Sequence, residues 1–166
     1  MFVPEIRFCD LKDLPALLEL NAASACPWPE RVIRNDLRPE SDVGITYLGA
    51  FATSPDAALL GYAVLGRDSG QGGGSAANAG LLMGLIVRAR YRRRGIGSQL
   101  LLAVADCAKY LGFTRLRLRV RRSNDAAQAL YRSMSFAPDG VSRGYYSNGE
   151  DAILMSAPLP FKGAGQ

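Results

Sequence analysis

The segment from 80 to 111 constrains the fold more than any other part of the chain. It begins with an uninterrupted apolar run at 80–87, continues through a short basic loop, and ends in an apolar pattern with helical spacing over 97–111. A continuous apolar run of this length is typical of a strand that is buried on both faces. A buried strand that leads into a long helix predicts an α/β or α+β fold with a mixed sheet.

The rest of the chain alternates between strand and helix patterns. Further strands are expected at 6–8, 45–50, 59–65, 114–120, 137–143 and 151–157. Further helices are expected from Asp10 to an exit at 21–25, from Pro29 to Leu37 and from 123 to Met134. The residues that favour these helix starts are Asp10, Pro29, Ser123 and Asn124.

Length and composition fit one compact domain over 1–166. The segment 68–79 is rich in glycine, serine, alanine and asparagine, and indicates a mobile loop that is either a substrate lid or a tolerated insertion. No apolar run approaches the roughly 20 residues that a membrane span needs, and residues 1–5 lack the pattern of a signal peptide. We therefore expect a cytoplasmic protein with no membrane association.

The chain contains no histidine. This excludes Ser–His and Cys–His nucleophile pairs and metal sites that use histidine, so no metal is expected. The three cysteines are far apart in the sequence, which disfavours a disulfide framework. Acid–base chemistry must therefore come from tyrosine, cysteine, lysine, carboxylates, backbone groups or water.

The basic loop has the features of an anion site. Arginines at 92–94 precede the sequence Gly-Ile-Gly-Ser at 95–98, where the long helix is expected to begin. The N–H groups of a first helical turn have no internal partners, and the helix dipole favours negative charge there. Because glycine also lets a ligand approach the backbone, this loop predicts a diphosphate cradle. Its spacing fits neither the Walker loop nor the three-glycine dinucleotide motif.

The pattern R-x-x-G-x-G at 92–97 resembles the pyrophosphate loop of the GNAT superfamily of N-acetyltransferases. The segment 120–136 is similar to that family's V-x-x-x-N-x-x-A-x-x-L-Y…G-F motif, with Ser135 in place of the glycine. Residues 27–30 and 145–152 resemble the RimI-type branch, which acetylates protein N-termini. The resemblance implies a single GNAT domain, in which a twisted mixed sheet of six or seven strands is flanked by about four helices, and acetyl-CoA as the cofactor.

The resemblance also implies roles for individual residues. The acyl and pantetheine part of acetyl-CoA would be held by the backbone of Leu85, Ile86 and Val87, with Asn124 on the pantetheine arm. The pyrophosphate would be bound by Arg92, Arg93, Arg94, Gly95, Ile96, Gly97 and Ser98. The departing CoA thiolate would receive a proton from Tyr131. The acceptor would lie near Trp28, Arg119, Tyr145 and Tyr146.

The implied reaction is direct attack of a primary amine on the thioester, without a covalent enzyme intermediate. A thiolate whose pKa is roughly 8.5 leaves more easily when it is protonated, and a tyrosine with a pKa near ~10 can supply the proton. We expect the acceptor to be a protein N-terminus and the protein to be a monomer or a homodimer. Two alternatives stay open: a small-molecule amine acetyltransferase, and a CoA- or polyanion-binding module without turnover.

Arg119 stands where the RimI-type branch has the glutamate that serves as general base. Three explanations remain open. An α-amine with a pKa near ~8 is partly neutral at pH 7, so water suffices as base. Alternatively Glu150, Tyr145 or Tyr146 takes the role. Finally, Arg119 together with Arg117 would recognise a carboxylate of the substrate.

Some of these features also have simpler interpretations. The arginine cluster at 88–94 is also typical of a nucleic-acid site, but it lacks an aromatic ladder, so nucleic acid is not the expected partner. The arginine face of 114–120 is expected to be a solvated edge. Trp28 fits the core between two helices as well as an acceptor site. Tyr145 and Tyr146 are adjacent, so only one of them faces the acceptor if both lie on a strand.

Overall fold

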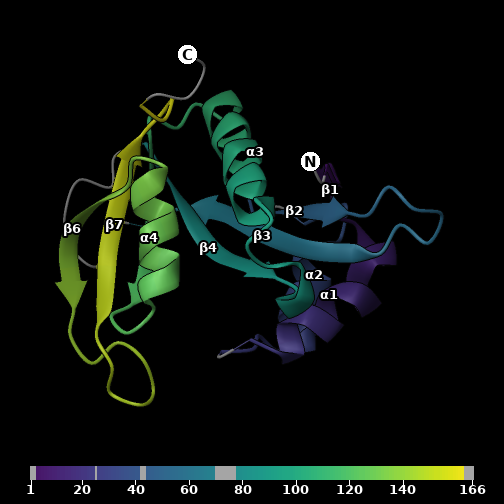
Figure 1. The fold of residues 1–166 in the computed structure, drawn as a ribbon, viewed down its shortest axis with the longest axis horizontal. Coiled ribbons are helices and arrows are strands. Elements are labelled where there is room, and N and C mark those ends of the chain that lie inside the picture. The colour runs from purple at the N-terminus through teal and green to yellow at the C-terminus, as the bar shows by residue number, and fades with distance from the viewer. Residues whose placement is uncertain (1–2, 25, 42–43, 70–77, 163–166) are drawn as a thin grey trace. The chain divides into compact units, whose positions relative to one another are not determined.

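The computed structural model describes residues 3–24, 26–41, 44–69 and 78–162. Its strands form one mixed sheet in the order β1-β2-β3-β4-β5-β7-β6, in which β4 and β5 are parallel (Figure 1). The strands are β1 (Glu5–Phe8), β2 (Thr46–Phe51), β3 (Leu59–Arg67), β4 (Ala79–Val87), β5 (Arg115–Arg121), β6 (Ala137–Ser142) and β7 (Ala152–Pro158). The α-helices are α1 (Leu14–Ala22), α2 (Glu30–Asp36), α3 (Ile96–Tyr110) and α4 (Asp125–Ser133). This confirms the expected α/β fold, with element ends shifted by a residue or two.

The chain divides into two compact units. The first contains residues 1–66 and 84–104, and the second contains residues 67–83 and 105–166. Both β4 and α3 contribute residues to each unit, so the sequence expectation of one domain over 1–166 stays a prediction. Among the described helices, none is long and apolar enough to cross a membrane.

The core of the first unit joins α1 and α2 to strands β2 and β3. Asp10 begins the helical segment as expected: its carboxylate accepts from the Lys12 N–H at 2.9 Å, and the Asp13 carboxylate accepts from the Asp10 N–H at 2.9 Å. This capping box opens a short 3₁₀ turn, η1 (Leu11–Asp13), that leads into α1. The core residues are Leu14, Leu17, Leu20, Ile33, Leu37, Tyr47, Phe51, Leu59, Tyr62 and Val64.

The second unit is built around β5, which lies between β4 and β7, with β6 as the outer strand. The apolar residues of β5 are buried, as the alternation of 114–120 predicts. Helix α4 is attached to the end of this strand, because the Gln128 amide donates to the carbonyl oxygens of Arg121 and Arg122 at 3.1 and 2.9 Å. Tyr131 of α4 packs against Phe136 with ring centroids 5.7 Å apart.

The arginine face of β5 is not the solvated edge that the alternation suggested. Arg117 is only 4% exposed and pairs with Asp68 at 2.7 Å and with Asp139 at 3.7 Å. The expectation was wrong because β5 is an interior strand, and a charge enclosed there must be paired. Periodicity in one strand reveals two different faces, but it does not reveal what covers them.

Strand β4 is buried on both faces only in its first half. Gly80 and Leu82 are buried, whereas the side chains of Leu85, Ile86 and Val87 are half-buried. The described register with β5 runs from Ala79↔Arg115 to Leu82↔Leu118. The expectation of complete burial is therefore wrong for 85–87, the part of the strand that the resemblance assigns to the cofactor.

The glycine-rich tract expected as a loop at 68–79 falls largely on residues 70–77, which lie outside the described residues. At its base, the Asp68 N–H donates to the Ala79 carbonyl oxygen at 3.0 Å.

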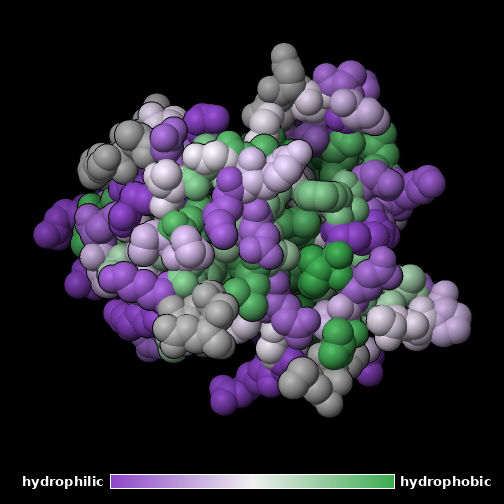
Figure 2. Space-filling model, turned by 90° about the horizontal axis from the view of Figure 1, so that it is seen from above, coloured by the Kyte–Doolittle hydropathy of each residue, from purple (hydrophilic) through white to green (hydrophobic). Residues whose placement is uncertain are grey.

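Hydrophilic and hydrophobic side chains are interspersed on the face seen in Figure 2. Large apolar side chains that remain exposed include Phe8, Leu102 and Tyr110, which come from different elements. Single exposed apolar residues are usual on a protein surface, so none of these alone marks a binding site.

Candidate active site

The first unit contains the loop that joins β4 to α3. After Val87 the chain forms a single 3₁₀ turn, η2 (Ala89–Tyr91), and α3 begins at Ile96. Arg93 and Gly95 adopt left-handed backbone conformations, with φ of 62° and 81°. The Gln99 N–H donates to the Gly95 carbonyl at 3.0 Å, which is the i→i−4 bond that opens the helix. The N–H groups of 96–98 precede that bond, so they have no acceptor within the helix and are available to an anion.

The arginines around this loop have different roles. Arg88 is structural: its guanidinium donates to the Leu59 carbonyl at 3.1 and 3.2 Å and pairs with Glu19 at 2.6 Å. Arg92 donates to the Val87 carbonyl at 3.1 Å, which folds the loop back on the end of β4. The exposed side chains in the cluster are those of Arg90, Arg92, Arg93 and Arg94. They give a positive charge to the loop that leads into a helix N-terminus, which itself favours anions.

The end of β4 lies unusually close to β3. A Cβ atom at Gly61 would lie 2.8 Å from the Ile86 carbonyl oxygen and 3.2 Å from the Val87 Cα, so only glycine fits there without a shift of the backbone. The Arg88 N–H also donates to the Leu60 carbonyl at 2.7 Å. The backbone of 85–87 is thereby fixed against β3. Sequence reasoning missed Gly61, although a glycine inside a strand pattern is a signal of close backbone approach.

Trp28 lies against β4 in the same unit. Its backbone is held by Asn21, whose side chain donates to the Trp28 carbonyl at 2.8 Å and accepts from the Trp28 N–H at 2.9 Å. Its ring packs edge-on to Tyr47, with centroids 6.5 Å apart, and a Cβ added at Gly84 would lie 3.7 Å from Trp28 Cη2. The side chain is half-buried. Trp28 thus packs on the core and also lies against β4 at Gly84, so the two interpretations of this residue are compatible.

The second unit contains Asn124 and Tyr131 on α4. The Asn124 side-chain oxygen accepts from the Ala127 N–H at 3.1 Å, which confirms the expected helix cap. That bond leaves the amide NH₂ of Asn124 as a donor. Burial raises the pKa of Tyr131 to about 12, with a smaller contribution from Tyr146, so the phenol stays protonated at neutral pH.

Tyr145 and Tyr146 lie in the connection between β6 and β7 and not on a strand. Each ring stacks on an arginine of β5: the Arg119 guanidinium is 5.2 Å from the Tyr145 centroid, and the Arg121 guanidinium is 3.9 Å from the Tyr146 centroid. The opposite-face argument for these two residues was therefore wrong, because it assumed strand geometry. Both tyrosines lie over the same face of β5.

Glu150 is tied into this connection as a hydrogen-bond acceptor. Its carboxylate accepts from the Ser123 N–H at 2.7 Å and pairs with Arg121 at 3.2 Å. The hydrogen bonds from Ser123, followed by those from Arg121, lower the pKa of Glu150. A carboxylate that is stabilised in its ionised form is a weak proton acceptor, which disfavours Glu150 as the general base.

Two of the three cysteines, Cys9 and Cys107, are at least partly buried. Burial raises the pKa of Cys9 to about 12 and also raises the pKa of Cys107, so neither is an activated thiolate. Among the described residues, no group of three or more histidine, cysteine or acidic side chains could hold a metal ion.

The structure places the expected residues in both units. Trp28, 85–87 and 92–98 belong to the first, whereas Asn124, Tyr131, Arg119 and the Tyr145–Tyr146 pair belong to the second.

A model of the acetyltransferase (GNAT) family matches residues 15–136. The chain belongs to this family. The ribosomal protein bS18-alanine N-acetyltransferase of Escherichia coli (strain K12) is 31% identical over 158 residues, which cover 93% of this chain and 97% of that protein. The crystal structure of the ribosomal-protein-S18-alanine N-acetyltransferase from Escherichia coli aligns with a TM-score of 0.76 and 27% identity over 99% of each chain. An N-alpha-acetyltransferase of Sulfurisphaera tokodaii is 42% identical over 81 residues, 48% of each chain.

This GNAT protein is an acetyl-CoA-dependent N-acetyltransferase. The features of its β4–α3 loop fit that cofactor. A left-handed glycine opens the helix, the N–H groups of its first turn have no helical acceptor, and exposed arginines precede them in the loop. These are the groups that a pyrophosphate needs.

We expect Gly95→Glu to weaken acetyl-CoA binding at least tenfold, or about 1.4 kcal/mol, in a calorimetric titration. The substitution places a bulky anion at the start of α3. The matched control is Gly112→Glu at the other end of α3, where φ is 91° and no atom lies within 4 Å of an added Cβ. Both variants carry the same charge and a left-handed backbone, so equal losses of affinity would contradict a cofactor site at Gly95.

Proposed function

We propose that this protein transfers the acetyl group of acetyl-CoA to the α-amine of a protein or peptide N-terminus. The relatives support this acceptor, because the Escherichia coli protein is a ribosomal protein bS18-alanine N-acetyltransferase and the Sulfurisphaera tokodaii protein is an N-alpha-acetyltransferase. The observation that carries the proposal is the start of α3, where the backbone and the arginines at 92–94 offer an anion site directly after the strand end at 85–87.

In this proposal the cofactor is bound mainly by backbone groups. The residues that hold the acyl and pantetheine part are Leu85, Ile86 and Val87, and those that hold the pyrophosphate are Arg92, Arg93, Arg94, Gly95, Ile96, Gly97 and Ser98. The close approach of β3 at Gly61 supports the first assignment, because it fixes the strand end before any ligand binds. Asn124 donates its amide NH₂ to the pantetheine arm.

Tyr131 acts on the leaving group as general acid. Its pKa of about 12 keeps the phenol protonated, so a donor is present throughout the reaction. Complete proton transfer to a thiolate with an ordinary pKa of about 8.5 would be uphill by roughly 5 kcal/mol. Tyr131 therefore stabilises the developing negative charge by donating a hydrogen bond, and its proton passes to the departing thiolate only as solvent returns a proton to Tyr131.

The amine loses its proton without a dedicated carboxylate. Arg119 stands at the position of the family glutamate and lies 5.2 Å from the Tyr145 ring, and Glu150 is committed to Ser123 and Arg121. An α-amine has a pKa near ~8, so a useful fraction is neutral at pH 7 and water suffices as proton acceptor. Arg117 is already paired with two carboxylates, which weakens the alternative that Arg117 and Arg119 jointly recognise an acidic substrate.

The residues proposed to contact the acceptor are Trp28 in the first unit and Arg119, Tyr145 and Tyr146 in the second. Trp28 lies against β4 at Gly84, the residue before the segment assigned to the thioester, and the two tyrosines stack on arginines of β5. In this role Arg119 orients Tyr145 and does not move a proton.

Tyr131→Phe is expected to lower kcat about 100-fold or more while the affinity for acetyl-CoA stays nearly constant, because only transition-state stabilisation is removed. Steady-state kinetics with a peptide acceptor, combined with calorimetry, measures both quantities. Tyr110→Phe is the matched control, since Tyr110 is 90% exposed on α3. An unchanged kcat in Tyr131→Phe would show that another group protonates the thiolate.

The pH profile tests the absence of a protein base. We expect kcat/KM for a peptide acceptor to rise through the pKa of its own α-amine, near ~8, and to stay level to about pH 10. There is no fall in this range because the pKa of Tyr131 is about 12. A peptide that begins with β-alanine has a more basic amine and moves the midpoint upward. An identical midpoint for both peptides would mean that a group on the protein titrates instead.

A further inference from the structure

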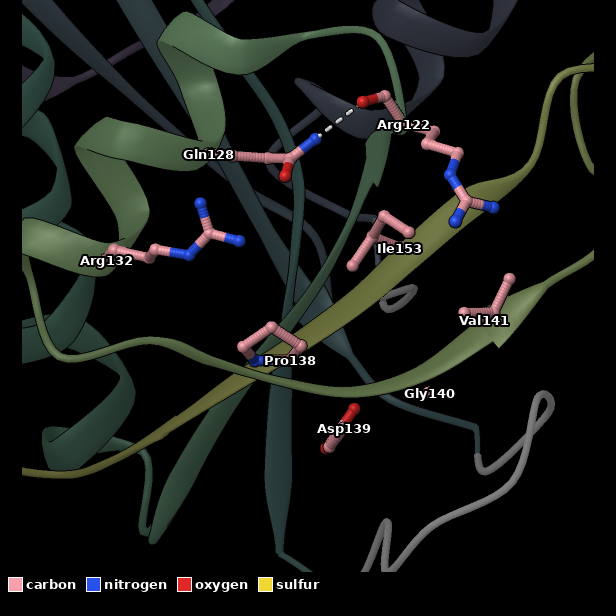
Figure 3. A pocket seen from close by; sticks show the side chains of 8 residues that line it. All are labelled: Arg122, Gln128, Arg132, Pro138, Asp139, Gly140, Val141 and Ile153. Carbon is pink, nitrogen blue, oxygen red and sulfur yellow. Dashed lines mark hydrogen bonds between the residues drawn. The ribbon is translucent and has the colours of Figure 1, made fainter.

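A groove lies beside α4 and the outer strands β6 and β7 in the second unit (Figure 3). Its volume is about 440 Å³. It is lined by Arg122, Gln128, Arg132, Pro138, Asp139, Gly140, Val141 and Ile153. None of these residues has a role in the acetyl transfer proposed above, so the groove is a separate surface feature.

The floor of the groove is the uncovered end of an apolar row that crosses the sheet. Val120 of β5, Ile153 of β7 and Val141 of β6 are register partners, so their side chains lie next to one another on one face. Val120 is 5% exposed, Ile153 is half-buried and Val141 is 47% exposed. Helix α4 is anchored at the end of β5, and the apolar row is left open toward the edge of the sheet.

Two guanidinium groups flank this floor. In Figure 3, Arg132 extends from α4 on one side of Ile153, and Arg122 lies on the other side. Arg132 is exposed, and the Arg122 side chain is 64% exposed although it pairs with Asp151 at 3.1 Å. Asp139 points away from the floor and lies 3.7 Å from Arg117. The groove is therefore apolar at its centre and has a guanidinium group on each side, of which Arg122 is already paired with Asp151.

The geometry of β6 disfavours a partner that would extend the sheet. Pro138 cannot donate a backbone hydrogen bond, and the register with β7 shifts between Pro138 and Gly140. An occupant is therefore expected to use side chains that enter the groove, and not a strand added to the edge. This also disfavours a second copy of the chain paired through β6.

We propose that the groove binds an extended segment of a partner protein in which acidic residues flank an apolar side chain. The apolar side chain would cover Ile153 and Val141, and the carboxylates would pair with Arg122 and Arg132. Burial of the apolar side chain on the floor adds affinity, whereas the exposed charge pairs set specificity and speed association. A segment with this order of side chains matches the groove because the apolar floor lies between the guanidinium groups of Arg122 and Arg132.

The test uses the ¹⁵N-labelled protein without acetyl-CoA and three N-terminally acetylated peptides, which carry no free α-amine. The probe is Glu-Asp-Leu-Ile-Glu-Asp, the second peptide has Ser-Ser at its centre, and the third has lysines in place of the acids. We expect the probe to shift the amide signals of Val141 and Ile153 and to bind with a Kd below about 1 mM, and the other two to bind at least tenfold more weakly.

Substitutions in the groove test whether the probe peptide binds there. Arg132→Glu and Val141→Asp should each weaken the probe at least tenfold, while Arg38→Glu, the same charge change at an exposed site in the first unit, should leave the Kd within about twofold. Far-UV circular dichroism verifies that each variant is folded. The proposal is overturned if the probe shifts no groove signal at 1 mM or if the serine peptide binds equally well. It is also overturned if Val141→Asp leaves binding of the probe unchanged and instead alters association between copies of this protein.

Discussion

The first turn of an α-helix leaves backbone N–H groups without acceptors, and the candidate site of this protein is organised around that turn in α3. From the end of β4 the chain reaches it through the 3₁₀ turn η2 and two left-handed residues, Arg93 and Gly95. Arg88 fixes the start of the loop by binding the Leu59 carbonyl and Glu19. A diphosphate carries acceptors of the kind that this helical turn lacks, and the exposed arginines carry charge of the sign that such an anion requires.

A second constraint acts one step earlier in the chain. Because Gly61 has no Cβ, β3 approaches the backbone of Ile86 and Val87 closely and fixes the end of β4. The side chains of 85–87 are only half-buried, although the segment is continuously apolar. An apolar strand end that is fixed in position and partly exposed is suited to bind the uncharged arm of a cofactor whose charged end lies at the helix.

Local signals in the sequence were sufficient for the strand–loop–helix unit, for the cap at Asn124 and for the family. They were insufficient where distant segments decide the environment. The arginines of β5 alternate like a solvated face, yet Arg117 is enclosed by Asp68 and Asp139, which lie far from it in the sequence. Tyr145 and Tyr146 form part of a connection whose conformation depends on Arg119, Arg121 and Glu150, so strand periodicity had no bearing on them.

Acetyl transfer to an α-amine can be tested by mass spectrometry of a peptide acceptor that is incubated with acetyl-CoA and the purified protein. The peptide should carry a free α-amine and one internal lysine, so that both amines compete in a single molecule. We expect acetylation at the α-amine, with one CoA thiol released per acetyl group transferred. Acetylation confined to the lysine, or binding of acetyl-CoA without transfer to any peptide or amine, would contradict it.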